Sequence, residues 1–362
     1  MNDESYIKLA LELAKKGKGK VSPNPLVGCV IVKDNTILSA GYHEFYGGPH
    51  AEANAINNAK CDLAGSTLYV NLEPCAHYGK TPPCVDKIIE NKISRVVIGT
   101  LDPNPLVSGK GVEKLKEAGI EVEIGLCRDE CLYTNRFFFK YITQKIPYIT
   151  LKIAQTLDGK IADINNDAFW ISSSPSRRFV HKLRSEYDAV LVGSNTIEVD
   201  NPQLTVRLTE GRNPKRIIVD TKLKIDLNKA IFDKNSDNII IIYSKKVNKL
   251  QKAKIKSLME KGVTLIPVNE TKDGLLNIKA ALKDLGTLNI SSILVEGGQK
   301  IFTYFLKNRF YDDIITFISP KILGIGISSF GDLNIKNIRK SIVHKISHYE
   351  KIGDDIMVVL KR

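Results

Sequence analysis

Residues 71–84 read NLEPCAHYGKTPPC, and residues 49–52 read PHAE. His50 opens a segment of helical composition, Pro74-Cys75 ends an apolar strand, and Cys84 opens a second helical segment after two prolines. One imidazole and two thiolates are three of the four ligands of a catalytic zinc ion, which keeps its last position for water. The two stretches therefore predict alternating strands and helices that bring three zinc ligands together.

The chemistry of these residues indicates a deaminase acting on an aminopyrimidine. Helix N-termini lower the pKa of thiols, and zinc lowers the pKa of bound water, so that hydroxide is available near neutral pH. Glu52, two residues after His50, is placed to take a proton from that water and to pass it to a ring nitrogen and then to departing ammonia. The order H-x-E…P-C…C is typical of zinc deaminases, although eight residues separate Cys75 from Cys84 instead of two. A structural zinc site, or three unrelated buried residues, would be the alternative.

The other cysteines have a plainer interpretation. Cys29 lies in an apolar strand and is expected in the core. Cys127 and Cys131 have no histidine nearby and are expected to be core or surface thiols. A long chain without an export signal favours metal binding over disulfides.

Outward from the quoted stretches, apolar runs and helical patterns alternate along all 362 residues. Predicted strands cover 27–32, 37–41, 67–72, 95–99, 120–124, 148–154, 189–193, 216–220, 239–243 and 293–296. Predicted helices cover 5–16, 51–59, 84–90, 111–118, 176–185, 245–261 and 276–285, and a further helix begins at 299. This alternation predicts an α/β fold with a largely parallel sheet. A boundary near residue 145 predicts two domains, 1–145 and 146–362.

The net charge of +13 is unevenly distributed. Residues 1–145 carry 18 basic and 17 acidic side chains, and the remainder carries 35 and 23. The basic residues of the second half are scattered rather than clustered, which argues against nucleic-acid binding and is compatible with an anionic substrate or cofactor. The sequence has no apolar run long enough for a membrane span and no secretory signal, so a cytoplasmic location is expected.

Several long stretches resemble the bifunctional deaminase/reductase family of riboflavin biosynthesis. In the first half they are PNPLVGCVIV (23–32), GYH (41–43), PHAE (49–52), NLEPCAHYGKTPPC (71–84) and DPNP (102–105). In the second half they are LKIAQTLDGKIA (151–162), WISS (170–173), SNTIEVDNPQLTVR (194–207), VDT (219–221) and VEGG (295–298). The resemblance covers essentially the whole chain, and the family shares the longer spacing between the two cysteines.

The resemblance implies two activities on small phosphorylated pyrimidines. The first domain, with a cytidine-deaminase-like fold, would deaminate 2,5-diamino-6-ribosylamino-4(3H)-pyrimidinone 5′-phosphate. The second, with a dihydrofolate-reductase-like fold, would use NADPH to reduce the ribosyl chain to ribityl. By resemblance, His50, Cys75 and Cys84 bind zinc and Glu52 moves the proton. Further residues at the substrate pocket would be Asn24, His43, Lys80 and Asn104, although turn formation also explains the two asparagines, which prolines flank.

In the second domain the resemblance supplies most of the assignments. Expected NADPH contacts are Ala154, Trp170, Thr196, Asp200, Thr221, Gly298, Gln299, Lys300, Ile301, Phe302, Thr303 and Tyr304. Expected substrate contacts are Ala168, Arg184, Leu204, Arg207 and Glu296. Guanidinium groups suit a phosphate, and a strand-like run at 204–206 would hold Arg207 near the carboxylate of Asp200. Lys152 and Asp200 are candidates to orient or protonate the opening sugar.

The residues alone say less about this second site. No G-x-G-x-x-G is present, but a strand at 293–296 followed by Gly297-Gly298 and a helix offers N–H groups to a phosphate. A plain strand-to-helix turn has the same pattern. The sequence departs from the family at Ala168, where a hydroxyl is common, and at 163–169 (DINNDAF), which lacks the usual small residues.

Two other functions share the first site. A nucleic-acid base deaminase, such as a tRNA adenosine deaminase with a basic domain, would need RNA and no nicotinamide cofactor. A zinc-stabilised binding module would not need Glu52, which is not required to hold zinc. Homo-oligomerisation stays open.

Overall fold

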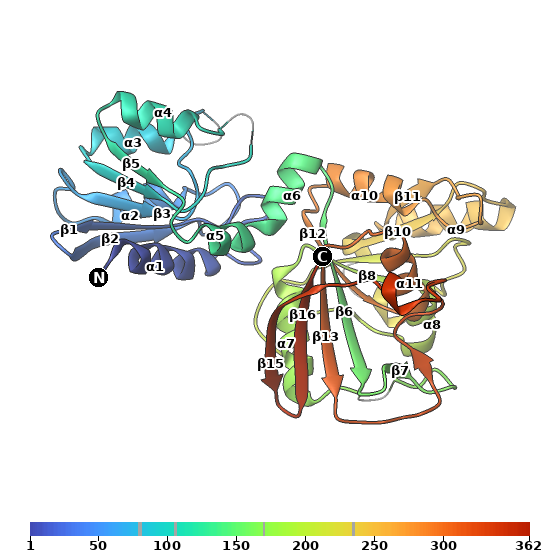
Figure 1. Ribbon diagram of the computed structural model, residues 1–362. Coiled ribbons are helices and arrows are strands. Elements are labelled where there is room, and N and C mark those ends of the chain that lie inside the picture. The colour runs from blue at the N-terminus through green and yellow to red at the C-terminus, as the bar shows by residue number, and fades with distance from the viewer. Residues whose placement is uncertain (79–81, 105–106, 169–170, 234–235) are drawn as a thin grey trace. The chain divides into compact units, whose positions relative to one another are not determined.

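The computed structural model describes residues 1–362 apart from 79–81, 105–106, 169–170 and 234–235. The chain divides into two compact units, which we call unit 1 (Met1–Lys145) and unit 2 (Ile146–Arg362). Both contain a central sheet covered by helices (Figure 1).

Unit 1 is built on a five-stranded sheet in the order β2-β1-β3-β4-β5. β1 pairs antiparallel with β2 and with β3, whereas β3, β4 and β5 are parallel. The turn Asp34-Asn35, with positive φ at both residues, closes the β1–β2 hairpin. The sheet is therefore mixed: β3, β4 and β5 are parallel as expected, and β1 alone runs against its two neighbours. The strands are β1 Gly28–Lys33, β2 Thr36–Tyr42, β3 Thr67–Val70, β4 Arg95–Ile98 and β5 Glu121–Ile124.

Helices cover both faces of this sheet, so unit 1 has three layers. Successive residues of β1 point to opposite faces, and both faces are buried, which explains its unbroken apolar run. Val30 and Val32 pack with α1 and α5, whereas Cys29 and Ile31 pack with α2, α3 and α4. The helices are α1 Asp3–Lys15, α2 Ala51–Asn58, α3 Cys84–Glu90, α4 Lys110–Glu117, α5 Arg128–Thr134 and α6 Arg136–Gln144.

Unit 2 contains a nine-stranded sheet in the order β11-β10-β9-β8-β12-β6-β13-β16-β15. The strands from β11 to β13 are parallel, and β16 and β15 add an antiparallel hairpin at one edge. A small sheet pairs β7 (Lys160–Ala162) with β14 (Ile327–Ser328). The strands of the large sheet are β6 Tyr148–Thr156, β8 Ala189–Gly193, β9 Lys215–Val219, β10 Ile239–Ser244, β11 Thr264–Val268, β12 Ser292–Gly297, β13 Asp313–Ser319, β15 Lys345–Ile352 and β16 Asp355–Lys361.

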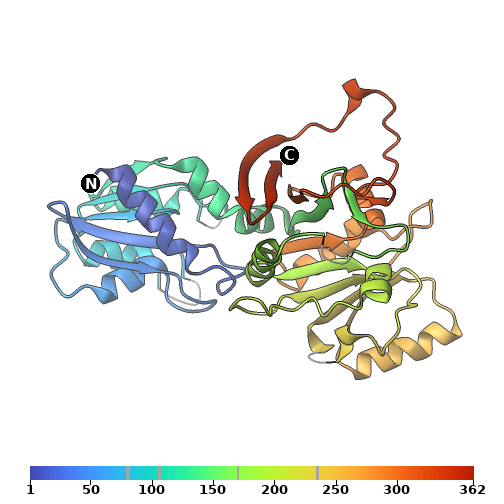
Figure 2. The same ribbon diagram turned by 90° about the horizontal axis from the view of Figure 1, so that it is seen from below.

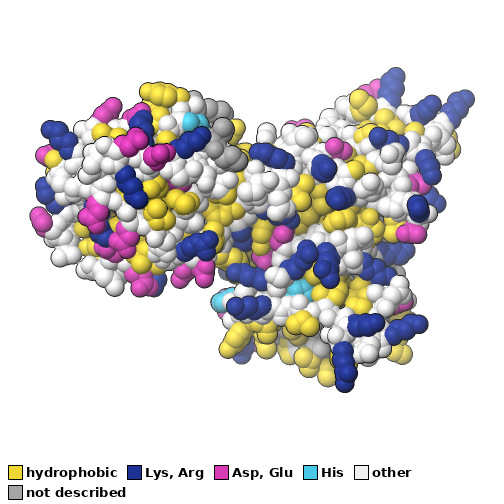
Figure 3. Space-filling view, turned by 45° about the horizontal axis from the view of Figure 1, so that its top comes forward, with side chains coloured by type: hydrophobic (Ala, Val, Ile, Leu, Met, Phe, Trp, Pro, Cys, Tyr) yellow, Lys and Arg dark blue, Asp and Glu magenta, His cyan; other side chains and the backbone are white. Residues whose placement is uncertain are grey.

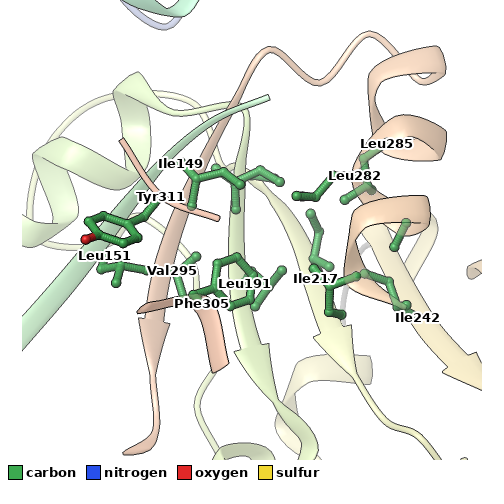
Figure 4. Packing of buried hydrophobic residues seen from close by; sticks show 14 of the residues in the cluster. Ile149, Leu151, Leu191, Ile217, Ile242, Leu282, Leu285, Val295, Phe305 and Tyr311 are labelled. Atoms are coloured by element: carbon green, nitrogen blue, oxygen red, sulfur yellow. The ribbon is translucent and has the colours of Figure 1, made fainter. Parts of the chain in front are cut away.

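The core of unit 2 lies between this sheet and its helices. Figure 4 shows Leu191, Ile217 and Val295 of neighbouring strands beside Phe305 of α11, with Leu285 of α10 on the same side of the sheet. The helices are α7 Ser174–Glu186, α8 Ser194–Asp200, α9 Lys249–Glu260, α10 Ile278–Thr287 and α11 Gln299–Lys307. The turned view in Figure 2 shows α9 and α10 from below, along with the hairpin of β15 and β16.

Two local expectations need correction. Residues 204–206 do not form a strand, and Leu204 has a positive φ of 55° within an irregular segment. The helix expected at 245–261 begins only at Lys249, where Asn248 accepts a hydrogen bond from Gln251 N and Gln251 bonds back to the Asn248 N–H.

The surface of unit 2 agrees with the scattered charge inferred from its sequence. Lys and Arg side chains are spread over the visible face of this unit in Figure 3 rather than gathered in one stripe. Within the described ranges, no helix combines the length and the hydropathy that crossing a membrane requires.

Candidate active sites

Three side chains that lie up to 34 positions apart in sequence converge in unit 1. His50 Nδ1 lies 3.5 Å from Cys75 Sγ and 3.4 Å from Cys84 Sγ, and all three ligand atoms lie within 4.8 Å of one another. His50 is the N-cap of α2 and Cys84 is the first residue of α3. The Cys84 N–H has no acceptor within the helix, because it lies in the first turn, and it donates to Cys75 Sγ at 3.4 Å. The fold thus places two of the ligands at helix N-termini and points them at the third.

This geometry fits a zinc ion. In a tetrahedral site with Zn–S of about 2.3 Å and Zn–N of about 2.0–2.1 Å, nitrogen and sulfur ligands lie about 3.5 Å apart. The measured separations from His50 Nδ1 match that spacing. Hydrogen bonds with Cys84 and His50 lower the pKa of the Cys75 thiol, although burial opposes them, so a thiolate ligand is favoured.

Glu52 is the carboxylate beside this cluster. It lies in the first turn of α2, is 3% exposed, and lines a pocket of about 320 Å³ together with His50 and Cys75. Burial raises its pKa to about 7. A carboxyl group with such a pKa can both accept and release a proton near neutral pH.

The wall of the pocket carries a fixed hydrogen-bonded pair. His43 Nδ1 donates to Pro49 O at 2.9 Å, so Nε2 is the acceptor and lies 3.2 Å from Asn24 Nδ2. Burial lowers the pKa of His43, and the ring is therefore neutral. Asn24, His43 and Asn104 all line the pocket, as expected from sequence. Lys80, the fourth residue of that group, lies outside the described residues.

A buried carboxylate that the sequence analysis missed holds the loop that carries Asn104. Glu73 is 4% exposed and accepts backbone hydrogen bonds from Asp102, Gly109, Gly111 and Val112 at 3.0–3.3 Å. Asp102, also missed, lines the pocket, and burial raises its pKa to about 6.

A positional signal for both carboxylates was present in the sequence. Glu73 and Asp102 each follow the end of a parallel strand, and such ends meet at one edge of a sheet. His77, between the two cysteines, was missed as well; it lines the pocket, and its Nδ1 is buried without a hydrogen-bond partner in the described part of the chain.

The second site is a pocket of about 490 Å³ at the carboxyl ends of β6, β8 and β12. Glu296, 6% exposed in its side chain, lines this pocket. Arg184 donates two hydrogen bonds to the Glu296 carboxylate, from Nε to Oε1 at 2.6 Å and from Nη2 to Oε2 at 2.9 Å. Lys152 Nζ lies 3.2 Å from Oε2 of the same carboxylate. Burial alone would raise the pKa of Glu296, but the two cations lower it to about 2.

The ion triad changes the expected role of Arg184. Its remaining Nη1 donates to Thr205 O at 3.2 Å, so the planar fork is already occupied by protein groups. Arg207 is exposed, and only its Nη1 is bonded, to Gln203 and Thr205; its Nε and Nη2 have no partner among the residues described. Arg207 was expected near the carboxylate of Asp200. Both side chains line the pocket, but in the described structure they form no ion pair. His181, 6% exposed, also lines it and was missed from the sequence, although it precedes Arg184 by three positions on one helix.

Some of the residues expected to contact the cofactor line this pocket, and others do not. Ala154, Thr196, Asp200, Gly298 and Phe302 line the pocket. The first residues of α11, Gln299 to Ile301, follow the N-cap Gly298 and have N–H groups without intrahelical acceptors. Thr303 Oγ1 instead accepts from Gly331 N at 2.8 Å, and the Tyr304 hydroxyl donates to Leu276 O at 3.0 Å.

The remaining expected residues lie around the pocket. Ala168, Arg184, Arg207, Glu296 and Lys152 line it, whereas Leu204 is buried and does not line it. Thr221 follows β9 at the same edge of the sheet without lining the pocket. Trp170 lies outside the described residues.

Comparisons with known proteins cover both units. Residues 1–100 match the family described as the cytidine and deoxycytidylate deaminase zinc-binding region, and residues 147–358 match the RibD C-terminal domain. The riboflavin biosynthesis protein RibD of Aquifex aeolicus is 49% identical over 99% of this chain and 98% of its own. That of Actinobacillus pleuropneumoniae is 39% identical over 99% and 95%.

Solved structures give the same result. The deaminase/reductase of Thermotoga maritima superposes with a TM-score of 0.87 at 42% identity, covering 99% of this chain and 98% of that one. RibD of Acinetobacter baumannii superposes with a TM-score of 0.89 at 34% identity, with the same coverage.

Fold and site together define a zinc-dependent deaminase joined to an NADPH-dependent reductase. The first unit is cytidine-deaminase-like and the second is dihydrofolate-reductase-like, as expected from the sequence. The chain belongs to the RibD family, the bifunctional deaminases and reductases of riboflavin biosynthesis. The resemblance found in the sequence is confirmed, and so are zinc and NADPH as the cofactors.

Proposed function

We propose that unit 1 deaminates 2,5-diamino-6-ribosylamino-4(3H)-pyrimidinone 5′-phosphate and that unit 2 reduces the product, 5-amino-6-(5-phosphoribosylamino)uracil, to the ribityl compound. The observation that carries the proposal is the His50–Cys75–Cys84 cluster beside the buried carboxylate of Glu52 in one pocket. The Thermotoga relative bears the names of both activities, which supports the same pair here.

In the deaminase, His50, Cys75 and Cys84 would hold zinc, which when bound makes water nucleophilic near neutral pH. Glu52 takes a proton from the attacking water and delivers it to a ring nitrogen. It then takes the second proton from the hydroxyl group that has been added to the ring carbon and gives it to the amino group, which leaves as ammonia while the carbonyl forms. Asn24, His43 and Asn104 face the same pocket and would orient the pyrimidine. The neutral ring of His43 is held in one orientation by its hydrogen bonds to Pro49 and Asn24, so it adds a polar group to the pocket wall without adding a charge.

In the reductase, NADPH supplies a hydride to the sugar carbon. Gly298 and the N–H groups of Gln299 to Ile301 would hold its pyrophosphate, because a helix N-terminus attracts anions. Arg207 has the free guanidinium edge and would bind the substrate phosphate. Lys152, beside Glu296 in the pocket, would donate a proton to the oxygen of the opening sugar.

A small molecule is supported as the substrate of both units. Each pocket is of the size typical of small-ligand sites, about 320 and 490 Å³. The basic residues of unit 2 form no stripe on the face seen in Figure 3, unlike a nucleic-acid surface.

The test is to incubate the zinc-loaded full-length protein with the diaminopyrimidinone, with and without NADPH, and to analyse the products by mass. Without NADPH we expect replacement of one amino group by oxygen, and with NADPH a further gain of two hydrogens. Absence of the first product in a zinc-loaded protein would refute the deaminase assignment, and absence of the second would refute the reductase assignment.

A further inference from the structure

The loop that carries Arg207 has little regular structure of its own. It follows α8, and residues 201–207 contain no helix or strand. Arg207 Nη1 bonds only to Gln203 and Thr205 of the same loop, so these contacts do not fix the guanidinium relative to the pocket. Its position must come from contacts between the loop and the rest of unit 2.

Helix α7 provides two such contacts from residues three positions apart, which lie on one face of a helix. His181 Nδ1 accepts the backbone N–H of Arg207 at 2.9 Å. Arg184 Nη1 donates to Thr205 O at 3.2 Å, and Arg184 is itself fixed by Glu296. The His181 bond acts directly on the residue that carries the free guanidinium.

The hydrogen bond also defines the state of the imidazole. Because Nδ1 accepts, the proton of the neutral ring is on Nε2. Within the described part of the chain the ring makes its hydrogen bond through Nδ1 and none through Nε2, and the residue lines the pocket. Burial, together with Arg184, Arg207 and Lys152, lowers the pKa of His181 to about 4 against the opposing effect of Glu296. The ring therefore stays uncharged, and Nδ1 stays an acceptor, at neutral pH.

We propose that His181 is a positioning residue of the reductase, which holds Arg207 in place for the phosphate of the substrate through its Nδ1. The proposal rests on the assignment of Arg207 to that phosphate. It adds a residue that does not itself contact the reacting atoms and explains how an irregular loop presents a cation at a defined place.

Two substitutions separate this role from mere pocket filling. In His181→Asn, the side-chain oxygen is attached to Cγ, as Nδ1 is, and can still accept the Arg207 N–H. In His181→Gln, the amide lies one carbon further out and that acceptor is lost. One backbone hydrogen bond contributes about 0.5–1.5 kcal/mol. We therefore expect His181→Gln to raise the KM for the phosphorylated substrate about three- to tenfold, with kcat and the KM for NADPH unchanged.

His181→Asn should recover most of the loss, and the melting temperature of the full-length protein should change by no more than about 5 °C in either variant. His348→Asn is the matched control, since His348 is an exposed histidine of β15 with a side chain 57% exposed. Equal KM values for the Asn and Gln variants, or an effect on NADPH instead of the substrate, would overturn the proposal.

A double-mutant cycle distinguishes this proposal from the phosphate assignment beneath it. Arg207→Ala removes the guanidinium but keeps the backbone N–H that His181 binds. If Arg207→Ala leaves the substrate KM unchanged, the phosphate assignment fails. If it raises that KM, His181→Gln in the Arg207→Ala background should add little, because the group that it positions is gone. A full additional increase in the double variant would refute the positioning role alone.

Discussion

Glu52 is the residue on which the deaminase depends most directly. We expect Glu52→Gln to keep zinc and to lose deamination by a factor on the order of 10² or more, because the amide cannot carry the proton. The side chain is buried beside the ligands without being one of them, so the metal should remain. Zinc content and deaminase turnover of the purified variant measure the two effects.

Two further variants complete this test. His50→Ala should lose zinc and deamination together, whereas Glu90→Gln, at an exposed position of α3, should change neither. Near-normal turnover in zinc-loaded Glu52→Gln would favour a structural metal site.

Glu296 is a residue whose loss should cost considerable stability. Glu296→Gln leaves Lys152 and Arg184 as buried cations without their shared carboxylate, and breaking such a group costs about 3–5 kcal/mol. The pKa of Glu296 is about 2, below its ordinary value of 4.5, so its stabilisation is present above about pH 4.5 and is lost as the pH falls toward 2.

Denaturation of the full-length protein at pH 7 measures this effect. The control is Glu260→Gln, whose pair with Lys256 is exposed and should contribute little. A loss below about 1 kcal/mol in Glu296→Gln would contradict the buried-charge argument.

Residues of the first site were predictable because they stand in short, ordered motifs. His50, Glu52, Cys75 and Cys84 belong to two stretches; three of them lie at the start of a helix, and Cys75 lies in the loop after β3. The triad of the second site was not predictable as a unit, since Arg184 and Glu296 are 112 positions apart. Arg184 was expected to bind phosphate, and only the structure shows that the carboxylate of Glu296 already occupies two of its guanidinium nitrogens.

At the scale of elements, the start of α4 is fitted closely against the loop after β3 that carries Cys75. A Cβ added to Gly111 would lie 2.2 Å from Pro74 O and 3.1 Å from Glu73 Oε1. Replacing a helical glycine by alanine usually stabilises by up to about 1 kcal/mol. Here we expect the opposite sign, a loss on the order of 1–3 kcal/mol, because the helix must move away from a backbone carbonyl.

Gly111→Ala should also raise the deaminase KM, because the Glu73 carboxylate accepts hydrogen bonds from backbone N–H groups of both this helix and the loop with Asn104. Reductase activity should not change. Lys116→Ala, on the exposed side of the same helix, is the control. Unchanged stability and KM in Gly111→Ala would show that α4 can shift freely.

Several elements were predicted from the apolar runs that burial leaves in the sequence, although β13, which is also buried, was missed. The apolar strands β8 and β10 and helix α3 begin where the sequence predicted. β15 was missed because it is exposed along almost its whole length, so KISHYEKI has no buried face to reveal. The antiparallel pairing of β1 with β3 was also missed, because register between distant strands depends on tertiary packing rather than on local pattern.

At the scale of the molecule, the uneven charge matches the division into units. Unit 1 is nearly neutral, and its pocket is lined by the acidic groups Glu52, Glu73 and Asp102. Unit 2 carries the excess of basic residues, and the cations Lys152, Arg177, Arg184 and Arg207 line its pocket. The cations around the pocket of unit 2 favour the binding of both an anionic cofactor and a phosphorylated substrate.

We propose that the two units are independent folding and functional domains, with the boundary at residue 145. Each has its own sheet and its own buried core, and the residues of each pocket come from one unit only. A fragment of residues 1–145 should bind about one zinc ion and deaminate, because all three ligands and Glu52 lie within it. A fragment of residues 146–362 should bind NADPH without zinc. Metal analysis of the first fragment and cofactor titration of the second measure this, with the full-length protein as reference. If both fragments are insoluble while the whole chain folds, the units stabilise each other and the boundary does not separate two domains.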